Sequence, residues 1–154
     1  LRRMLGAFHR VPTLADDSGI IHAVLYAVNA EYRSSDVKSR CNIVLRFRQK
    51  LAQTYTQKSP DFAAGEHSDD FAANLRNYSG RISPAALRFI EVALKLNIAL
   101  LHMPREKLLR KIQSDFADTI VLAWDGNWGV LHFEETGSCM VPLSRGSVID
   151  GLLL

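Results

Sequence analysis

The sequence predicts one layered α/β domain, in which a small mixed or antiparallel sheet packs between helices. Helical apolar periodicity fills the first part of the chain, and short β-branched apolar runs follow it. The length of 154 residues and the hydrophobic fraction of 47% suit one core, so residues 1–154 are expected to form a single domain. Because the chain begins with Leu1, we expect it to be part of a longer protein.

The first elements expected are helices. Residues 1–8 predict a short helix, which ends before Pro12 because proline disfavours helix in the residue ahead of it. Residues 15–19 have turn composition. Residues 20–32 predict a helix with one apolar stripe, and Asp36 would cap a second long helix that ends near residue 56. The stripe consists of Ile21, Val24, Leu25 and Val28.

A polar loop and two further helices come next. The loop covers residues 57–69, and a short helix covers residues 70–78. Ser83-Pro84 marks the start of another helix, which is expected to end near residue 96. Serine accepts hydrogen bonds from free N–H groups, and proline suits the first helical position.

Strands are expected in the last third of the chain. The apolar run 98–101 predicts a strand, and residues 105–113 predict a helix. Residues 119–124 are β-branched and apolar, which favours a strand. Asp-Gly-Asn at 125–127 is turn chemistry, and residues 128–134 return as a second strand. This hairpin is the clearest β signal in the sequence.

Charge and cysteine content exclude several classes of function. The net charge is +3, and no aromatic residues interleave with a basic run, so we read the charges as solvated helix faces and expect no nucleic-acid site. No apolar run approaches the ~20 residues of a membrane span. The two cysteines, Cys41 and Cys139, have no CxxC spacing, which predicts no zinc cage, other metal site, cofactor or disulfide framework. A reducing compartment such as the cytoplasm is the simpler interpretation. We expect Cys41 to lie in the core and Cys139 to have no functional role.

Three stretches carry a family resemblance. Residues 16–23 read Asp-Asp-Ser-Gly-Ile-Ile-His-Ala, and residues 84–101 read as a helix followed by an aliphatic strand. Residues 120–134 form the hairpin that ends in His132-Phe133-Glu134. In this order the stretches resemble the ovarian-tumour (OTU) family of cysteine deubiquitinases, with its Asp-Gly-Asn-Cys turn, its Leu-Phe-His-Ala helix start and its final His-Tyr-Asn or His-Tyr-Asp. The resemblance implies an OTU-like fold of the papain type.

The resemblance also implies catalytic positions. The nucleophilic cysteine of the family falls on Gly19, at a helix N-terminus where the thiol pKa would be lowered. His132 would be the general base. Glu134 is two residues further on, and residues i and i+2 of a strand face the same way, so Glu134 would orient the imidazole.

The turn before Gly19 would stabilise an oxyanion through its backbone N–H groups. It contains Asp16, Asp17 and Ser18. We expect Asp16 to cap the helix, and Asp17 stands where the family often has glycine. Ser18 lies one residue too early to replace the nucleophile, and His22 is expected to have no chemical role.

The hairpin aromatic residues have two interpretations. Trp124, Trp128 and Phe133 pack the core and the sheet edge, or they shape a channel for the C-terminal tail of ubiquitin if the family resemblance holds.

Gly19 cannot form an acyl-enzyme, so this chain is predicted to bind ubiquitin or a ubiquitin-like protein without cleaving it. One hypothesis is an OTU-type deubiquitinase domain in which engineering has replaced the nucleophile by Gly19. A shift of the motif by one position would place Ile20 there, which is no better as a nucleophile. Other hypotheses are a natural pseudoenzyme, a viral polyprotein-processing protease of the same fold, and an unrelated α/β interaction domain. For a viral or pathogen protein the compartment would be the host-cell cytoplasm, and the oligomeric state is not predicted.

Overall fold

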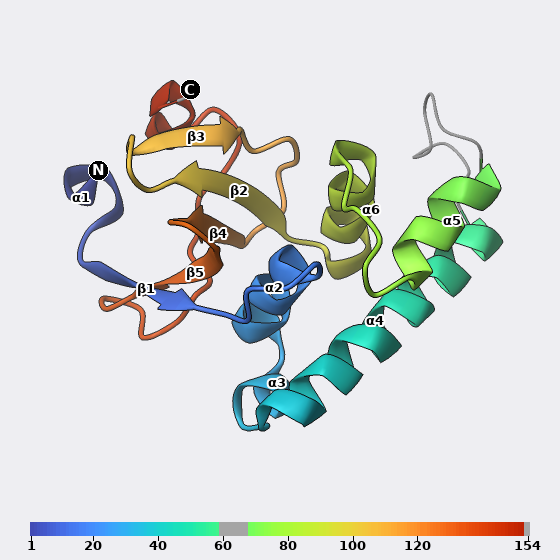
Figure 1. Ribbon diagram of the computed structural model, residues 1–154. Coiled ribbons are helices and arrows are strands. Elements are labelled where there is room, and N and C mark those ends of the chain that lie inside the picture. The colour runs from blue at the N-terminus through green and yellow to red at the C-terminus, as the bar shows by residue number, and fades with distance from the viewer. Residues whose placement is uncertain (59–67, 153–154) are drawn as a thin grey trace.

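A computed structural model describes residues 1–58 and 68–152 of the chain. A five-stranded sheet forms one side of the molecule, with strand order β1-β5-β4-β2-β3 (Figure 1). Strands β2 and β4 are parallel, and the other neighbouring pairs are antiparallel. The strands are β1 (Phe8–Pro12), β2 (Asn97–His102), β3 (Lys107–Arg110), β4 (Thr119–Trp124) and β5 (Trp128–Phe133). The sheet is therefore mixed, as predicted.

Most of the helices gather on one side of this sheet. Helix α2 lies between the sheet and α4, and α5 packs along the end of α4 (Figure 1). The helices are α1 (Arg2–Leu5), α2 (Gly19–Val28), α3 (Ala30–Arg33), α4 (Val37–Lys58), α5 (Ser68–Arg76), α6 (Pro84–Leu94) and the 3-10 helix η2 (Val148–Leu152). Within the described ranges, no helix has the length and apolarity needed to cross a membrane.

The two faces of the sheet carry separate hydrophobic clusters. In β4, Ile120 and Leu122 belong to the cluster shared with the helices, whereas Val121 and Ala123 belong to the cluster on the opposite face. This alternation follows from the two-residue period of a strand. Ile149 of η2 belongs to the second cluster, so the last described residues close that face. The predicted layered α/β class is confirmed.

Local capping explains several element boundaries. Asp36 Oδ1 accepts a hydrogen bond from Ser39 N at 2.8 Å, and Ser83 Oγ accepts one from Ala86 N at 3.1 Å, as the sequence predicted. The predicted helix 20–32 is instead two helices. Asn29 has φ −125° and ψ 111°, which ends α2, and its side chain caps α3.

Two strands were not predicted from the sequence: β1, which begins at the last residue of the predicted helix 1–8, and β3, which lies within the predicted helix 105–113. Residues 1–8 give only the short α1, and the chain from Phe8 then pairs with β5 in the register Phe8↔Phe133. Residues 105–113 were predicted as a helix but contain β3, which pairs with β2. Glu106 has φ +52°, a conformation that turns the chain back instead of continuing a right-handed helix. Of the predicted loop 57–69, residues 59–67 lie outside the described residues.

Candidate functional site

The turn at residues 16–19 leads directly into α2. Asp16 Oδ1 accepts a hydrogen bond from Ser18 N at 2.9 Å, and Gly19 N donates to Asp16 O at 3.0 Å. Ser18 is the residue before the helix, and it makes no side-chain capping bond. Asp16 therefore shapes the turn, whereas the sequence predicted that it would cap the helix. The neighbouring Asp17 is exposed to solvent.

The Ser18 side chain is fully buried and hydrogen-bonded in the protein interior. Its hydroxyl donates to Tyr78 O and accepts from Arg48 Nη1 at 2.9 Å. Because this hydroxyl already bonds two partners and neither is a general base, Ser18 has no means of acting as a substitute nucleophile.

Arg48 of α4 organises this region. Its guanidinium is fully buried and donates to the backbone carbonyls of Asn74, Leu75, Tyr78 and Gly80 as well as to Ser18. Burial lowers the pKa of Arg48 to about 10, so the group stays charged at neutral pH. One cation thus joins the turn, α4 and the segment after α5.

The side chain that faces Gly19 is Trp128. A Cβ added to the buried Gly19 would lie 3.6 Å from Trp128 Cδ1 and 3.6 Å from Leu14 O, which are ordinary van der Waals distances. Position 19 therefore has room for a Cβ. A longer side chain at this position would meet an indole ring.

His132 lies at the other end of β5. It is four residues after Trp128 in the same strand, which corresponds to about 13 Å. Its ring packs against His9 with 4.8 Å between centroids, and its Nδ1 is buried without a hydrogen-bond partner. The structure thus does not bring His132 to Gly19.

Glu134 follows the end of β5 and is exposed. Its backbone N–H donates to Ala7 O at 3.0 Å. Since His132 Nδ1 has no partner among the described residues, Glu134 does not orient that imidazole through this atom.

The three aromatic residues predicted to line a channel separate into different environments. Trp124 and Trp128 are cross-strand partners at the hairpin end, and Trp124 stacks on His102 at 5.2 Å. Phe133 is only 2% exposed and packs near Phe8 in the cluster on the opposite sheet face. Trp128 alone among the three lies next to Gly19.

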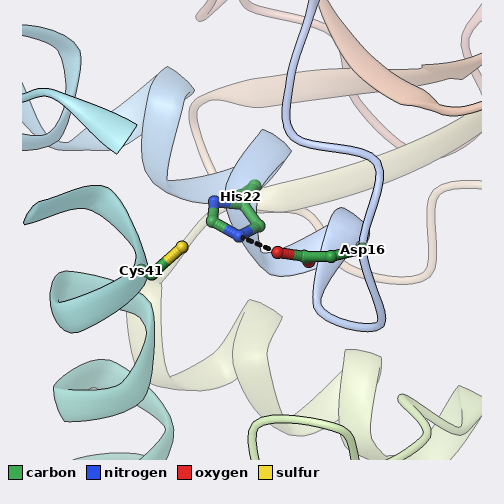
Figure 2. A group of neighbouring side chains, drawn as sticks. All are labelled: Asp16, His22 and Cys41. Atoms are coloured by element: carbon green, nitrogen blue, oxygen red, sulfur yellow. Dashed lines mark hydrogen bonds and ion pairs between the residues drawn. The ribbon is translucent and has the colours of Figure 1, made fainter. Parts of the chain in front are cut away.

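A polar cluster below the turn was not expected from the sequence. His22 is fully buried, and its Nε2 lies 3.1 Å from Asp16 Oδ2 (Figure 2). The Tyr78 hydroxyl lies 2.7 Å from the same nitrogen. The Nδ1 of His22 lies 2.5 Å from the Tyr32 hydroxyl. The Tyr78 hydroxyl oxygen also lies 2.6 Å from Asp16 Oδ2, to which it can donate its one proton, and 3.4 Å from Cys41 Sγ. Cys41 is therefore half-buried at the edge of a polar cluster, and not purely a core residue.

Burial dominates the electrostatics of this cluster. It lowers the pKa of His22, although the nearby Asp16 carboxylate raises it in part. Burial raises the pKa of Tyr32 to about 12. The pKa of Tyr78 is also raised, first by burial and then by its hydrogen bond to Asp16. Asp16 and His22 are six residues apart on a turn and the helix that follows it, so the sequence could have indicated that they lie close together. Tyr78 lies in a distant loop, and no local sequence pattern connects it to them.

An open pocket of about 540 Å³ has Ile20, the residue after Gly19, in its lining. The start of α6 and the exposed Leu109 of β3 line it as well. Its lining is mostly apolar, with Arg81 and Lys111 among its polar members.

No family model matches the sequence, and no curated protein matches it. Solved structures do resemble the fold. An ovarian tumour (OTU) domain in complex with ubiquitin gives a TM-score of 0.60 at 16% identity, covering 94% of this chain and 79% of that chain. The OTUD1 OTU domain gives 0.61 at 13% identity, covering 80% of this chain and 85% of that chain. The Hazara virus OTU bound to ubiquitin gives 0.53 at 16% identity, covering 82% and 81% respectively. The chain therefore has an OTU-like fold, as its three motif-like stretches predicted.

Proposed function

We propose that this domain is a ubiquitin-binding or ubiquitin-like-protein-binding module of the OTU type that performs no thiol hydrolysis. The observation that carries the proposal is the pair of facing residues at the start of α2. Gly19 stands at the nucleophile position of the motif, and the side chain opposite it is Trp128. A thiol protease needs a thiolate and an adjacent base, and this pair supplies neither.

The indole that faces Gly19 favours a natural loss of activity over an engineered one. An engineered inactivation removes one reactive group and leaves the base in place. Here the residue facing position 19 is an indole, whose only polar atom is a hydrogen-bond donor that cannot accept a proton. The nearest histidine in sequence, His22, has both ring nitrogens engaged by Asp16, Tyr32 and Tyr78.

Binding is proposed at the surface beside this pair. The lining of one pocket includes both Ile20, next to the nucleophile position, and Leu109, whose side chain is exposed. An extended tail that reached position 19 would lie along such a pocket and would bury Leu109. Exposed apolar side chains in a concave surface are typical of binding sites.

The binding test is a titration of isotope-labelled ubiquitin with the domain, followed by NMR. We expect saturable shifts, and we expect Leu109→Asp to weaken binding at least about ten-fold. Leu45→Asp is the matched control, because Leu45 is also an exposed leucine but lines a different surface on α4. Absence of saturable binding to ubiquitin and to ubiquitin-like proteins at about 1 mM would reject the proposal.

The chemical test uses a ubiquitin probe with a C-terminal electrophile. The wild-type domain and Gly19→Cys are expected to label slowly or not at all at position 19. The double variant Gly19→Cys, Trp128→His is expected to label about 100-fold faster than Gly19→Cys, which is the contribution of a general base. His132→Ala in the double-variant background should change nothing. Loss of labelling on His132→Ala would instead support His132 as the base.

A further inference from the structure

We propose that Asp16, His22 and Cys41 form a binding site for a zinc-like transition-metal ion. One potential ligand atom from each of these residues lies within 4.8 Å of the other two (Figure 2). The three side chains come from the turn, from α2 and from α4. This inference does not depend on ubiquitin binding.

The donors converge on one point. The Tyr78 hydroxyl oxygen lies 2.6 Å from Asp16 Oδ2, 2.7 Å from His22 Nε2 and 3.4 Å from Cys41 Sγ. A single atom therefore already contacts all three donors. Asp16 lies at Nε2 of His22, and the Tyr78 hydroxyl that contacts this nitrogen also contacts the Cys41 thiol. Convergence of this kind is the geometry of ion binding.

The donor set suits zinc. Zinc binds thiolate sulfur at about 2.3 Å and imidazole nitrogen or carboxylate oxygen at about 2.0–2.2 Å, and it accepts mixed tetrahedral sets. Asp16 and a deprotonated Cys41 together supply two negative charges, which balance the charge of a divalent ion. Hard cations such as Mg²⁺ prefer oxygen ligands, so the cysteine and histidine select against them.

The surroundings of His22 match those of a metal ligand. Ligating histidines usually donate their second ring N–H to a fixed partner, which sets the tautomer. The Tyr32 hydroxyl lies 2.5 Å from Nδ1 and is in position to accept that bond, leaving the Nε2 lone pair free for the ion. Asp16 is 34% exposed at its side chain, so an ion can enter from solvent.

Binding of the ion requires one local rearrangement. The Tyr78 hydroxyl leaves the shared point, and the Cys41 thiol releases its proton as the metal–sulfur bond forms. Tyr78 is only half-buried and lies in the loop after α5, so its ring can turn outward. The ion would then join the turn before Gly19 to α2 and α4.

The test is a titration with Co²⁺ as a spectroscopic probe, followed by competition with Zn²⁺. We expect one equivalent of Co²⁺ to produce a thiolate charge-transfer band that Zn²⁺ removes. Cys41→Ser should abolish the band and weaken Zn²⁺ binding by more than about 100-fold, the upper end of losses seen for outer-shell partners. Cys139→Ser is the matched control, because it removes the other cysteine, and it should bind like the wild type.

Two further measurements keep the test decisive. Zn²⁺ should raise the melting temperature of the wild type and of Cys139→Ser but not of Cys41→Ser. If Cys41→Ser does not fold, Asp16→Asn replaces it, with the same expected loss of binding. Tyr78→Phe removes the competing hydroxyl and should bind Zn²⁺ more tightly. A wild-type domain without a one-to-one thiolate band, or a band that persists in Cys41→Ser, would overturn the proposal.

Discussion

Replacing the buried Arg48 by methionine should strongly destabilise the fold. Arg48 makes five hydrogen bonds, four of them to backbone carbonyls. Methionine fills a similar length but donates none of them. The carbonyls of Asn74, Leu75 and Gly80 then lose this donor, whereas Tyr78 O keeps the Ser18 hydroxyl. A buried acceptor left unpaired costs about 1–3 kcal/mol. If water reaches one of these three carbonyls, about two remain unpaired, and the expected loss of unfolding free energy is about 3–5 kcal/mol.

The assay for Arg48→Met is urea unfolding, with the free energy compared at constant slope. Arg46→Met is the matched control on the same helix. Arg46 is 68% exposed at its side chain and lies 3.8 Å from Glu31, a surface pair worth at most about 0.5 kcal/mol. If Arg48→Met unfolds within about 1 kcal/mol of Arg46→Met, the carbonyl cluster does not hold the turn and the reasoning fails.

Three further predictions concern other buried groups. Gly19→Ala should melt at or above the wild-type temperature, because the added Cβ meets only ordinary contacts. Gly129→Ala should melt several degrees below the wild type, because its Cβ would lie 2.5 Å from Val11 O. Equal melting temperatures of the two variants would contradict this prediction. Glu91→Ala should lower the free energy of unfolding, measured in urea, by about 3–5 kcal/mol. The substitution leaves the buried Arg110 without its partner at 2.5 Å and Ile98 N without its acceptor. A loss below about 1 kcal/mol would argue against a structural ion pair. Cys139 should react with iodoacetamide only when the protein unfolds, because the side chain is buried and burial raises the pKa of its thiol. Rapid alkylation of the folded protein at Cys139 at pH 8 would contradict this packing.

The fold class could be predicted from the sequence because the residues that determine the helix starts and the hairpin are close together in the chain. Ser83 and Asp36 act as caps within three residues of the groups they bind, and the hairpin turn at 125–127 joins adjacent strands. β1 and β3 had no such signal. Phe8 lies in a strand because it pairs with Phe133, which is far along the chain. Residues Lys107–Arg110 form a strand because they pair with β2. Such pairing overrides local helix propensity.

The catalytic assignment met a different obstacle. Strand periodicity places Trp128, Val130 and His132 on one face of β5, so His132 shares a face with the residue beside Gly19. Periodicity does not say which end of that face meets the helix. The packing of α2 decides it, and α2 begins beside Trp128.

The same packing explains why polar residues near the turn do not amount to protease chemistry. Asp16 and His22 bond to each other and to Tyr78, and Arg48 binds carbonyls, so each group holds neighbouring segments together. None of these bonds reaches the pair at the start of α2, where glycine faces an indole. A polar cluster that is fully bonded within itself stabilises the turn whether or not position 19 reacts. The turn can therefore keep its shape without a thiol at position 19, and under the proposed function a partner that recognises the turn and its pocket would bind it.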